Sequence, residues 1–319
     1  MNKETIFTIV VTYGNREHFL LKTIKALLNQ TFLIDKIIVV NNASNLNLNE
    51  PLLKSDKISI LNNNQNLGSA IGYKKGIQLA CIENADLIWL VDDDNIAEKD
   101  ALEKLINFNK GNLLNSQIAV SSFRTSRKKY YDLFHTNING LKIEKKNLFF
   151  GLEFAKIIKK RIHPLDHLQV DYVTYGGFLF SSKSVEIVGL PDENYFLYMD
   201  DREYTYRFTN NGIKIFVLRS SKLDDIDNSW NSGNYFKLPV YFIPETSKIK
   251  IFYSFRNKIR FDLKHIVTSK FLYKYSVYFY IGFGCIMALF NKIPIKIIKV
   301  RSKLLISILK KEFININKK

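Results

Sequence analysis

Short runs of apolar, mostly β-branched residues recur through the first 125 residues of the chain and predict buried strands. Between the first two runs, leucine and isoleucine recur every three or four residues over 17–29, which is the spacing of one helical face. A similar segment covers 97–108, and a further helix is expected to run to about residue 82. The strand runs lie at 5–12, 36–41, 57–61, 87–91 and 118–122. This alternation predicts an α/β fold with an open, mostly parallel sheet.

Polar residues directly follow three of the predicted strands. Thr12–Asn15 follow the first strand, Asn41–Ser44 the second and Asp92–Asp94 the fourth. Ligands of open α/β sheets bind beyond the carboxyl ends of the strands. We therefore expect a ligand site where these three segments meet.

Three adjacent carboxylates, Asp92, Asp93 and Asp94, end the apolar run LIWLV. Because like charges at this spacing repel, a cation is expected to neutralise them, and carboxylate oxygens suit a hard ion such as Mg²⁺ or Mn²⁺. In an extended chain Asp92 and Asp94 point to one side and Asp93 to the other, so Asp92 and Asp94 are the candidate metal pair. The alternative is a solvated acidic turn in which Asp94 or Asn95 caps the next helix.

Two weaker signals lie near these acids. In the loop NNNQNLGSAIG (62–72), Gly68 and Gly72 allow close approach of the backbone to a ligand, and helix N-terminal amides favour phosphate or hydroxyl oxygens. The amide of Asn41 is suited to the edge of a nucleobase. The alternatives are an ordinary turn for the loop and a local Asx-turn for Asn41.

A second acidic cluster occurs in the segment YMDDREY (198–204). If a helix starts here, Asp200 and Glu203 share one face and Asp201 points about 100° away from Asp200. A carboxylate in this position is suited to take a proton from a hydroxyl as a general base. The alternative is capping of a helix, whose N-terminus favours acidic residues.

The chain of 319 residues (37.2 kDa) is 46% hydrophobic, which excludes a disordered or collagen-like polymer. Its net charge of +17 is concentrated at the end: residues 248–319 carry 17 Lys and Arg against Asp262 and Glu312, a net +15, which leaves +2 for residues 1–247. We therefore expect a boundary near 240–248, with one domain at 1–247 and a basic, amphipathic helical region at 248–319.

The cysteine content and the N-terminal segment indicate the cellular compartment in which the protein is expected. Two cysteines, Cys81 and Cys285, are too few for a disulfide framework, and the short apolar run near the N-terminus predicts a strand rather than a signal peptide. A reducing cytoplasm is therefore expected.

The basic region contains two segments of interest. In 295–313, Lys296, Lys299, Lys303 and Lys310 lie on one helical face, and Ile298, Leu305 and Leu309 on the other. This pattern is typical of a helix in an anionic membrane surface, and equally of an amphipathic helix docked on its own domain. The apolar stretch 276–290 would span about 22 Å as a helix. Because the hydrocarbon core is roughly 30 Å thick, a buried hairpin or a membrane-surface insertion is favoured over a span.

Net charge and abundant Tyr and Phe also raise the possibility of a nucleic-acid-binding protein. The chain contains no RNP, zinc or helix-turn-helix pattern, and its charge clusters in an apolar tail, so no nucleic-acid partner is expected.

Several segments in a fixed order connect these observations: VVTYGNR, IIVVNNAS, NNQNLGSAIGYKKGI, LIWLVDDDN, YGGFLF, LYMDDREYTYR and YSFRN. Over roughly residues 5–260 they resemble glycosyltransferase family 2, most of all its galactofuranosyl- and rhamnosyltransferase-like branch. The resemblance implies the A-type glycosyltransferase fold, a Rossmann-like arrangement. It also implies a nucleotide-diphosphate sugar as donor, a divalent metal, Mg²⁺ or Mn²⁺, and inversion at the anomeric carbon.

The resemblance also assigns roles to residues, with donor binding in about 1–120 and acceptor binding and catalysis in about 170–247. Asp201 matches the general base, with Asp200 and Glu203 orienting acceptor and base. Asp92 and Asp94 match the nucleotide and metal motif, with Asp93 facing the donor sugar. The remaining donor-binding matches are Thr12, Tyr13, Asn15, Asn41, Asn66 and Gly68. The acceptor-side turn matches Tyr175, Gly176 and Gly177.

Two positions depart from the family pattern. The family usually has an aspartate where this chain has Asn41, and often has a metal-binding histidine where this chain reads SSKLDDIDNSW. Asp224 or Asp225 is the candidate replacement ligand, with Asp225 preferred from the spacing after Gly212. Trp230, in the same segment, is expected to stack on an acceptor sugar or to act as a lid.

The resemblance and the basic tail together predict a bacterial transferase that moves galactofuranose, rhamnose or galactose to a glycan or lipid-linked glycan in polysaccharide synthesis. The protein is expected in the cytoplasm, attached peripherally to the inner face of the cell membrane. One alternative is a sugar nucleotidyltransferase, but the segment Tyr13–Arg16 lacks the Gly-rich loop of that class. Another is a non-catalytic glycan-binding relative, which the two acidic clusters disfavour.

Overall fold

The computed structural model describes residues 4–127, 134, 143, 145–149, 165–227 and 238–316. The chain divides into two compact units, an α/β unit (1–142, 159–196 and 200–230) and a helical unit (143–158, 197–199 and 231–319). The division at residue 231 precedes the expected boundary near 240–248. The reason is that Leu238, Tyr241 and Phe242 pack in the core of the helical unit.

Four parallel strands form the N-terminal half of the sheet. They are β1 (Ile6–Tyr13), β2 (Lys36–Asn42), β3 (Ile58–Asn63) and β4 (Leu87–Asp92). Strand β1 lies between β2 and β4, and β2 pairs with β3 on its other side. In this register Thr12 is opposite Asn41, and Val11 is opposite Asp92. The polar segments that follow the strands therefore meet at one edge of the sheet, as the sequence predicts.

The other half of the sheet is mixed. Its strands are β5 (Asn95–Ala97), β6 (Ile118–Arg124), β7 (His167–Val170), β8 (Phe178–Ser181) and β9 (Lys214–Asp225). The order is β3-β2-β1-β4-β8-β6-β9-β5, with β7 also paired to β9. Strand β8 runs antiparallel to both β4 and β6, whereas β6 and β9 are parallel. This arrangement brings Arg124, at the end of β6, and Asp225, at the end of β9, toward the edge where β4 ends.

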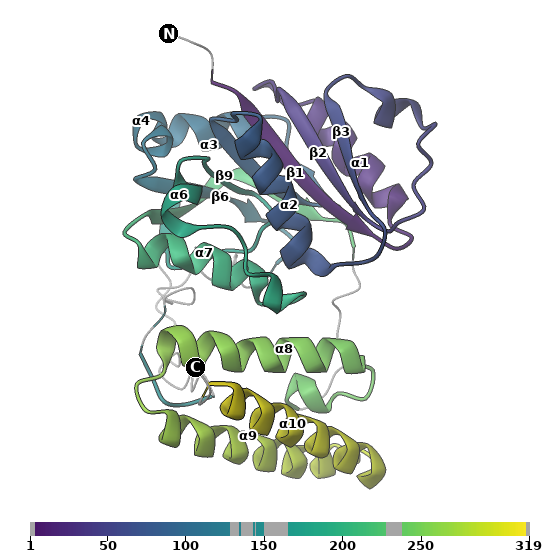
Figure 1. Cartoon of the computed structure of the whole chain (residues 1–319), viewed down its shortest axis with the longest axis vertical. Coiled ribbons are helices and arrows are strands. Elements are labelled where there is room, and N and C mark those ends of the chain that lie inside the picture. The colour runs from purple at the N-terminus through teal and green to yellow at the C-terminus, as the bar shows by residue number, and fades with distance from the viewer. Residues whose placement is uncertain are drawn as a thin grey trace. The chain divides into compact units, whose positions relative to one another are not determined.

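Helices cover both faces of the sheet (Figure 1). Helices α2 (Gly68–Ile82), α6 (Ser184–Val188) and α7 (Asp200–Asn210) cover one face. Helices α1 (Glu17–Leu28), α3 (Ala101–Phe108) and α4 (Lys110–Leu114) cover the other. Side chains alternate along β1, so Ile9 and Val11 enter the first core and Ile6 and Val10 the second. Short 3₁₀ turns occur at Pro51–Lys54 and Glu193–Tyr195.

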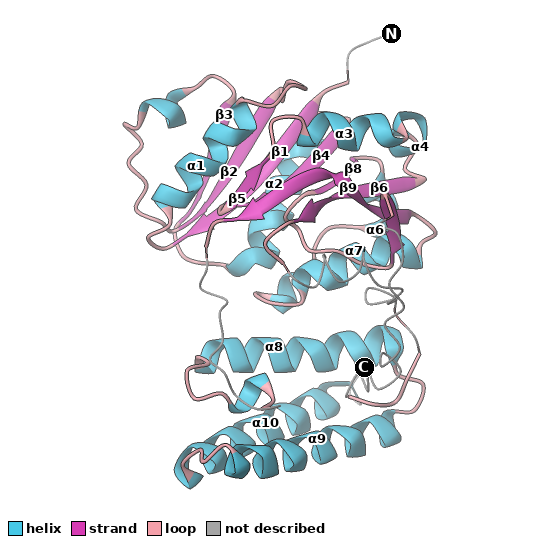
Figure 2. Ribbon diagram, turned by 180° about the vertical axis from the view of Figure 1, so that it is seen from behind, coloured by secondary structure: helices cyan, strands magenta, loops and turns pink. Residues whose placement is uncertain are grey.

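The described part of the helical unit contains three long helices (Figure 2). They are α8 (Lys248–Phe261), α9 (Lys270–Phe290) and α10 (Ile295–Ile316), with a π turn at Asp262–Ile266 and a 3₁₀ turn at Val240–Phe242. Ser247 begins α8 by accepting a hydrogen bond from the N–H of Lys250. The core of this unit contains Phe255 of α8, Tyr273 of α9 and Leu305 of α10, all fully buried.

Both segments that the sequence marks for a membrane are helical. Helix α9 begins at Lys270, six residues before the apolar stretch at 276–290, and in the described part of the chain it is the one helix long and apolar enough to cross a membrane. In α10, Ile298, Leu305 and Leu309 are buried in the core of the helical unit. The apolar face of α10 is therefore docked on the protein, which is the alternative that its pattern left open.

Helix α2 lies unusually close to the sheet because glycines face β1. A Cβ atom at Gly72 would lie 2.6 Å from Cγ1 of Val11, and one at Gly76 would lie 2.4 Å from Cγ2 of Ile9. Neither position accommodates a side chain without movement of β1 or of the helix. This close approach places the neighbouring side chains of α2 against the carboxyl ends of the strands.

The Gly76→Ala variant is expected to unfold more easily by about 1–3 kcal/mol, because the added methyl group overlaps Ile9. Urea unfolding followed by circular dichroism measures the change. The matched control is Gly111→Ala in α4, where a Cβ meets nothing within 4 Å. A Gly76→Ala protein as stable as the control would contradict this account of the packing.

Candidate active site

Asp92 ends β4, and neighbouring strands and helices hold its carboxylate. The hydroxyl of Tyr73 in α2 donates to Oδ1 at 2.9 Å, and Nη1 of Arg124 lies 3.2 Å from Oδ2. The backbone N–H of Asp92 donates to the side chain of Asn95. The side chain of Asp92 is 34% exposed, whereas Tyr73 and Arg124 are buried. The carboxylate of Asp92 is thus held by buried partners on one side and open to solvent on the other.

Asp93 and Asp94 form a turn rather than an extended segment, so the alternation of side chains expected along a strand ends at Asp92. Asp93 is buried, accepts a hydrogen bond from Thr12 at 2.8 Å and pairs with Arg16 at 2.9 Å. Arg16 also lies 3.1 Å from Asp94. Burial, with the charges of Asp92 and Asp93, raises the pKa of Asp94 to about 7. The neighbouring acids thus add to the effect of burial on Asp94, and Arg16 opposes both.

Three arginines that the sequence reading did not assign to the site lie among these carboxylates. Arg16 pairs with Asp227 as well as with Asp93 and Asp94. Arg124 bridges Asp92 and Asp225, and Arg127 pairs with Asp225 at 2.6 Å. The position of Arg124 at the end of the apolar run IAVSSFR was the available signal, since a buried strand that ends in arginine needs an acidic partner.

Asp225, the preferred candidate for the third metal ligand, is surrounded by donors. Besides Arg124 and Arg127, Nδ2 of Asn95 donates to its Oδ1 at 2.9 Å. Burial favours the neutral acid, but the two guanidinium groups outweigh it and hold the pKa of Asp225 below its usual range. Asp224 instead accepts a hydrogen bond from Thr125. Asp225 thus already has cationic partners in this structure.

The second acidic cluster begins α7. Asp200 is buried, and Oγ of Ser69 in α2 donates to its Oδ2 at 2.6 Å. Burial and the charge of Asp201 raise the pKa of Asp200 to about 8. Asp201 is half-buried, and burial raises its pKa as well. Glu203 is fully buried and lies 3.2 Å from Nε of Arg207, one turn further along α7.

The backbone just before Asp200 is strained. Phe196, Tyr198 and Met199 have φ values of 62°, 63° and 66°, which non-glycine residues rarely adopt. Within the helical unit, Nδ2 of the fully buried Asn257 donates to the carbonyl oxygens of Leu197 and Tyr198, at 2.9 and 2.8 Å. Asn257 is the last residue of the YSFRN segment, so this motif supports the turn that leads into the acids.

One face of α2 connects the two clusters. Ser69 and Tyr73 are four residues apart, so they lie on the same side of the helix; one contacts Asp200 and the other Asp92. The negative charge of Asp92 also raises the pKa values of both Asp200 and Asp201. Two acidic segments more than 100 residues apart in sequence therefore share one site.

The donor-binding residues predicted from the sequence lie around this edge, and some are exposed whereas others are buried. Tyr13, the last residue of β1, and Asn15 are both exposed. Asn41 is buried: its Oδ1 accepts the N–H of Ser44, and its Nδ2 donates to Ser44 and to Asn62. The Asx-turn alternative for Asn41 is thus what the structure contains.

Asn66 and Gly68 form the turn before α2. The exposed Asn66 accepts a hydrogen bond from the N–H of Gly68 at 2.9 Å. Gly68 has a φ of +80° and packs against the carbonyl of Phe196. Both residues thus shape the loop that places Ser69.

The predicted acceptor-side turn packs against the first acidic cluster. A Cβ atom at Gly176 would lie 2.1 Å from Arg124 and 2.7 Å from Asp92, so only glycine fits there. Gly177 has a φ of +92°, and its N–H donates to Leu90. Tyr175 is buried against Tyr73, with ring centroids 4.1 Å apart. Trp230 lies outside the described residues.

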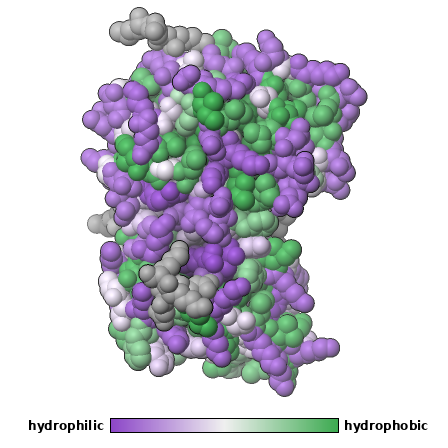
Figure 3. Space-filling view, viewed as in Figure 1, coloured by the Kyte–Doolittle hydropathy of each residue, from purple (hydrophilic) through white to green (hydrophobic). Residues whose placement is uncertain are grey.

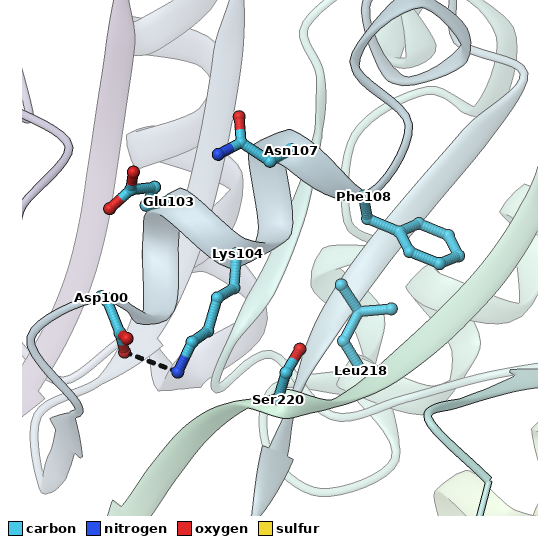
Figure 4. A pocket seen from close by; sticks show the side chains of 7 residues that line it. All are labelled: Asp100, Glu103, Lys104, Asn107, Phe108, Leu218 and Ser220. Atoms are coloured by element: carbon cyan, nitrogen blue, oxygen red, sulfur yellow. Dashed lines mark ion pairs between the residues drawn. The ribbon is translucent and has the colours of Figure 1, made fainter.

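Among the described residues, no preformed metal cage marks the site. Within residues 4–127, 165–227 and 238–316, no group of three or more His, Cys, Asp or Glu side chains is arranged around a common point. A surface depression of about 480 Å³ lies between α3 and β9 (Figure 4). None of the candidate residues line it, and Lys104 there pairs with Asp100. The depression is therefore separate from the acidic clusters.

Comparisons with known proteins identify the family of this chain. A model of the family described as "Glycosyl transferase family 2" matches residues 8–186. The dTDP-rhamnosyl transferase RfbF of Shigella flexneri is 25% identical over 225 residues, which is 68% of this chain and 68% of that protein. Galactofuranosyltransferase GlfT1 of Mycobacterium tuberculosis is 34% identical over 102 residues, which is 30% of this chain and 32% of that protein.

Solved structures share the fold. GalNAc-T7, crystallised with UDP, GalNAc and Mn²⁺, superposes with a TM-score of 0.55 at 12% identity, over 82% of this chain and 48% of that one. TarS of S. aureus superposes with a TM-score of 0.50 at 12% identity, over 85% of this chain and 41% of that one. Each match spans less than half of the solved protein.

The fold is that of the A-type glycosyltransferases, and the protein is a glycosyltransferase. The matched family model covers more than half of the chain, so the protein belongs to glycosyl transferase family 2.

The raised pKa of Asp200 predicts how stability depends on pH. In the unfolded chain this carboxyl ionises near 3.8, whereas in the folded protein it stays protonated up to about 8. The folded state therefore holds the extra proton between these values, and its contribution to stability is lost as pH rises through about 8. Without divalent metal, the Asp200→Asn variant is expected to gain about 1–3 kcal/mol over wild type at pH 8 and to match it near pH 4.

Urea unfolding at several pH values measures this difference. The control is Asp56→Asn, which removes an exposed carboxylate outside the site. Wild type and Asp200→Asn curves that run parallel from about pH 4 to pH 8 would contradict the assignment of a raised pKa to Asp200.

Proposed function

We propose that this protein is an inverting, metal-dependent transferase that moves a sugar from a nucleotide-diphosphate donor to a hydroxyl group of a glycan or lipid-linked glycan. The observation that supports this most directly is the meeting of Asp92 with Asp200 and Asp201 across one face of α2. One cluster is suited to the leaving diphosphate and the other to the acceptor hydroxyl. Rhamnose and galactofuranose are proposed from the names of the similar transferases, and galactose from the resemblance of the sequence segments.

The residues present fit a divalent cation. Five carboxylates (Asp92, Asp93, Asp94, Asp225 and Asp227) face three guanidinium groups (Arg16, Arg124 and Arg127), so two negative charges remain when all are ionised. A hard ion accepts carboxylate and phosphate oxygens together. Asp92 and Asp94 would hold Mg²⁺ or Mn²⁺, with Asp225 as the third candidate ligand. When bound, the ion would neutralise the charge that develops on the leaving diphosphate.

Different surroundings separate the roles of the two acids at the start of α7, since Asp200 is buried against Ser69 and Asp201 is half-buried. With a pKa of about 8, Asp200 is mostly protonated at pH 7 and acts as a hydrogen-bond donor that orients the acceptor. The half-buried Asp201 takes the proton from the attacking hydroxyl as general base. The hydroxyl attacks from the face opposite the leaving group, which gives inversion without a covalent intermediate. Glu203 acts on this pair indirectly, since it is held by Arg207 inside α7.

Donor and acceptor would be bound by the surrounding turns. Tyr13 and Asn15 are exposed next to the acids and are proposed to contact the nucleotide, together with Thr12, Asn41, Asn66 and Gly68 around the same edge. Asp93 is proposed to face the donor sugar. Tyr175, Gly176, Gly177 and Trp230 are proposed for the acceptor side. The helical region would attach the enzyme peripherally to the inner face of a bacterial cell membrane, where lipid-linked glycans are built into surface polysaccharides.

A donor panel tests the reaction class. Purified protein with Mg²⁺ or Mn²⁺ is expected to hydrolyse slowly one of a set of UDP- and dTDP-sugars, and to transfer its sugar when a glycan acceptor is present. Pyrophosphate-dependent exchange of the nucleotide, or no turnover of any donor, would contradict the proposal.

The Asp201→Asn variant is expected to lose about 10²–10⁴-fold in kcat because it lacks the base. Donor affinity, measured by isothermal titration calorimetry, should remain close to that of wild type. The control is Asp56→Asn, which removes an exposed carboxylate outside the site. Full transfer activity in Asp201→Asn would remove Asp201 from this role.

Chelation of divalent ions is expected to abolish transfer, and Mn²⁺ or Mg²⁺ to restore it. In Asp92→Asn the concentration of Mn²⁺ for half-maximal activity should rise at least tenfold, because a ligand loses its charge. Paramagnetic resonance of bound Mn²⁺ provides a second measurement. An enzyme fully active in excess chelator would sink the metal-dependent mechanism.

A further inference from the structure

We propose that the outward face of α9 is the surface by which this protein lies on a membrane of anionic phospholipids, with the helix axis parallel to the membrane plane. This inference rests on the membrane attachment in the proposed function and names the segment responsible. The sequence pattern made both 295–313 and 276–290 candidates for membrane contact, but the apolar face of the helix at 295–313 is buried in the structure.

The exposed face of α9 is uniformly apolar. After Lys270 its exposed positions, besides Gly282, carry only large hydrophobic or aromatic side chains. Phe271, Phe279 and Phe290 are 67%, 70% and 76% exposed. The others are Leu272, Tyr275, Phe283, Ile286 and Leu289. Such residues occur singly on most protein surfaces, whereas a continuous exposed set of this size marks an interaction site.

The exposed and buried residues occupy opposite sides of the helix. At 100° per residue, the exposed set falls within an arc of about 120°, and the buried residues Tyr273, Val277, Ile281, Gly284 and Ala288 fall in an arc centred about 180° away. From Phe271 to Phe290 the exposed face extends about 29 Å. The face is thus a straight apolar stripe along the full helix.

The charges around this stripe favour an anionic partner. The two acids after residue 247 are both buried and paired: Asp262 lies 2.6 Å from Lys258, and Glu312 lies 2.6 Å from Arg260. Exposed lysines lie at both ends of α9 and along α10: Lys270, Lys292, Lys296, Lys299, Lys303, Lys310 and Lys311. An apolar stripe with basic residues and no exposed carboxylate in the same segment is the composition of a helix in an anionic interface.

On the face drawn in Figure 3, hydrophobic residues are interspersed with hydrophilic ones over most of the surface. A second copy of the chain is a poorer partner for the stripe than lipid, because two copies would bring like-charged lysines together.

An orientation parallel to the membrane follows from the buried side of α9. The hydroxyl of Tyr273 donates to Asp262 at 2.7 Å, and the N–H of Phe149 donates to Ser276 at 2.9 Å. Crossing a bilayer would separate these groups from their partners, at a large cost in hydrocarbon. Lying on the surface leaves them intact and buries only the exposed stripe.

The test is co-sedimentation of the full chain with vesicles of phosphatidylcholine containing about one-third phosphatidylglycerol, compared with pure phosphatidylcholine. Wild type is expected to bind the anionic vesicles and to bind less well at high salt. The triple variant Phe271→Ser, Phe279→Ser, Phe290→Ser should bind at least tenfold more weakly. A second variant, Lys296→Gln, Lys299→Gln, Lys303→Gln, should weaken binding to anionic vesicles only.

The matched control replaces three exposed hydrophobic residues of the α/β unit, Leu48→Ser, Ile82→Ser and Ile187→Ser, and should bind as wild type does. Equal binding by wild type and the phenylalanine variant would overturn the proposal. A wild-type protein that forms a dimer and binds no vesicles would also overturn it, if the phenylalanine substitutions dissociate that dimer. Resistance of the wild type to alkaline carbonate extraction from cell membranes would show a spanning helix and also overturn it.

Vesicle binding requires no donor and no turnover, so this proposal and the transferase proposal fail separately. Hydrolysis of a soluble nucleotide sugar should be unchanged in the phenylalanine variant. Loss of vesicle binding with retained hydrolysis thus tests α9 alone.

Discussion

Electrostatic repulsion among crowded carboxylates is the constraint on which the centre of this molecule depends. Asp92, Asp93 and Asp94 end one strand, and β9 brings Asp225 beside them. Burying such a group of carboxylates without counter-charges would cost more free energy than the net stability of most folds. The chain meets this constraint with Arg16 and Arg124, which reach the acids from the loop after β1 and the end of β6. The ion pairs between these arginines and acids therefore hold together both the fold and the acidic site.

Features that are local in sequence could be predicted from it. The strands β1 to β4, the helices α1 and α3, and the acids after β4 follow from short-range periodicity, and the structure confirms them. Which partners the acids find could not be predicted in this way. Ser69 meets Asp200 and Arg124 meets Asp225 across separations of 131 and 101 residues. Those pairings depend on the antiparallel insertion of β8 between β4 and β6, for which the local pattern gives no sign.

Amphipathic helices show a second limit of sequence patterns. In α10 the apolar residues face the protein core, whereas α9 has apolar residues on two opposite sides, one buried and one exposed. Periodicity reports that a helix has an apolar face but not what that face contacts, since protein and lipid interiors favour the same side chains. The structure distinguishes the two helices. Helix α10 buries the apolar face that contains Leu305, whereas α9 buries the side that contains Tyr273 and exposes the opposite apolar side.

The support that Asn257 gives to the turn at 196–199 has a consequence for the order in which the enzyme matures. The ribosome completes the strained turn almost sixty residues before it reaches the asparagine that holds its carbonyl groups. Until then the left-handed backbone of Tyr198 and Met199 lacks this support. The turn would thus reach its supported conformation late in translation, and a nascent or prematurely terminated chain without α8 would lack both hydrogen bonds even with its sheet complete.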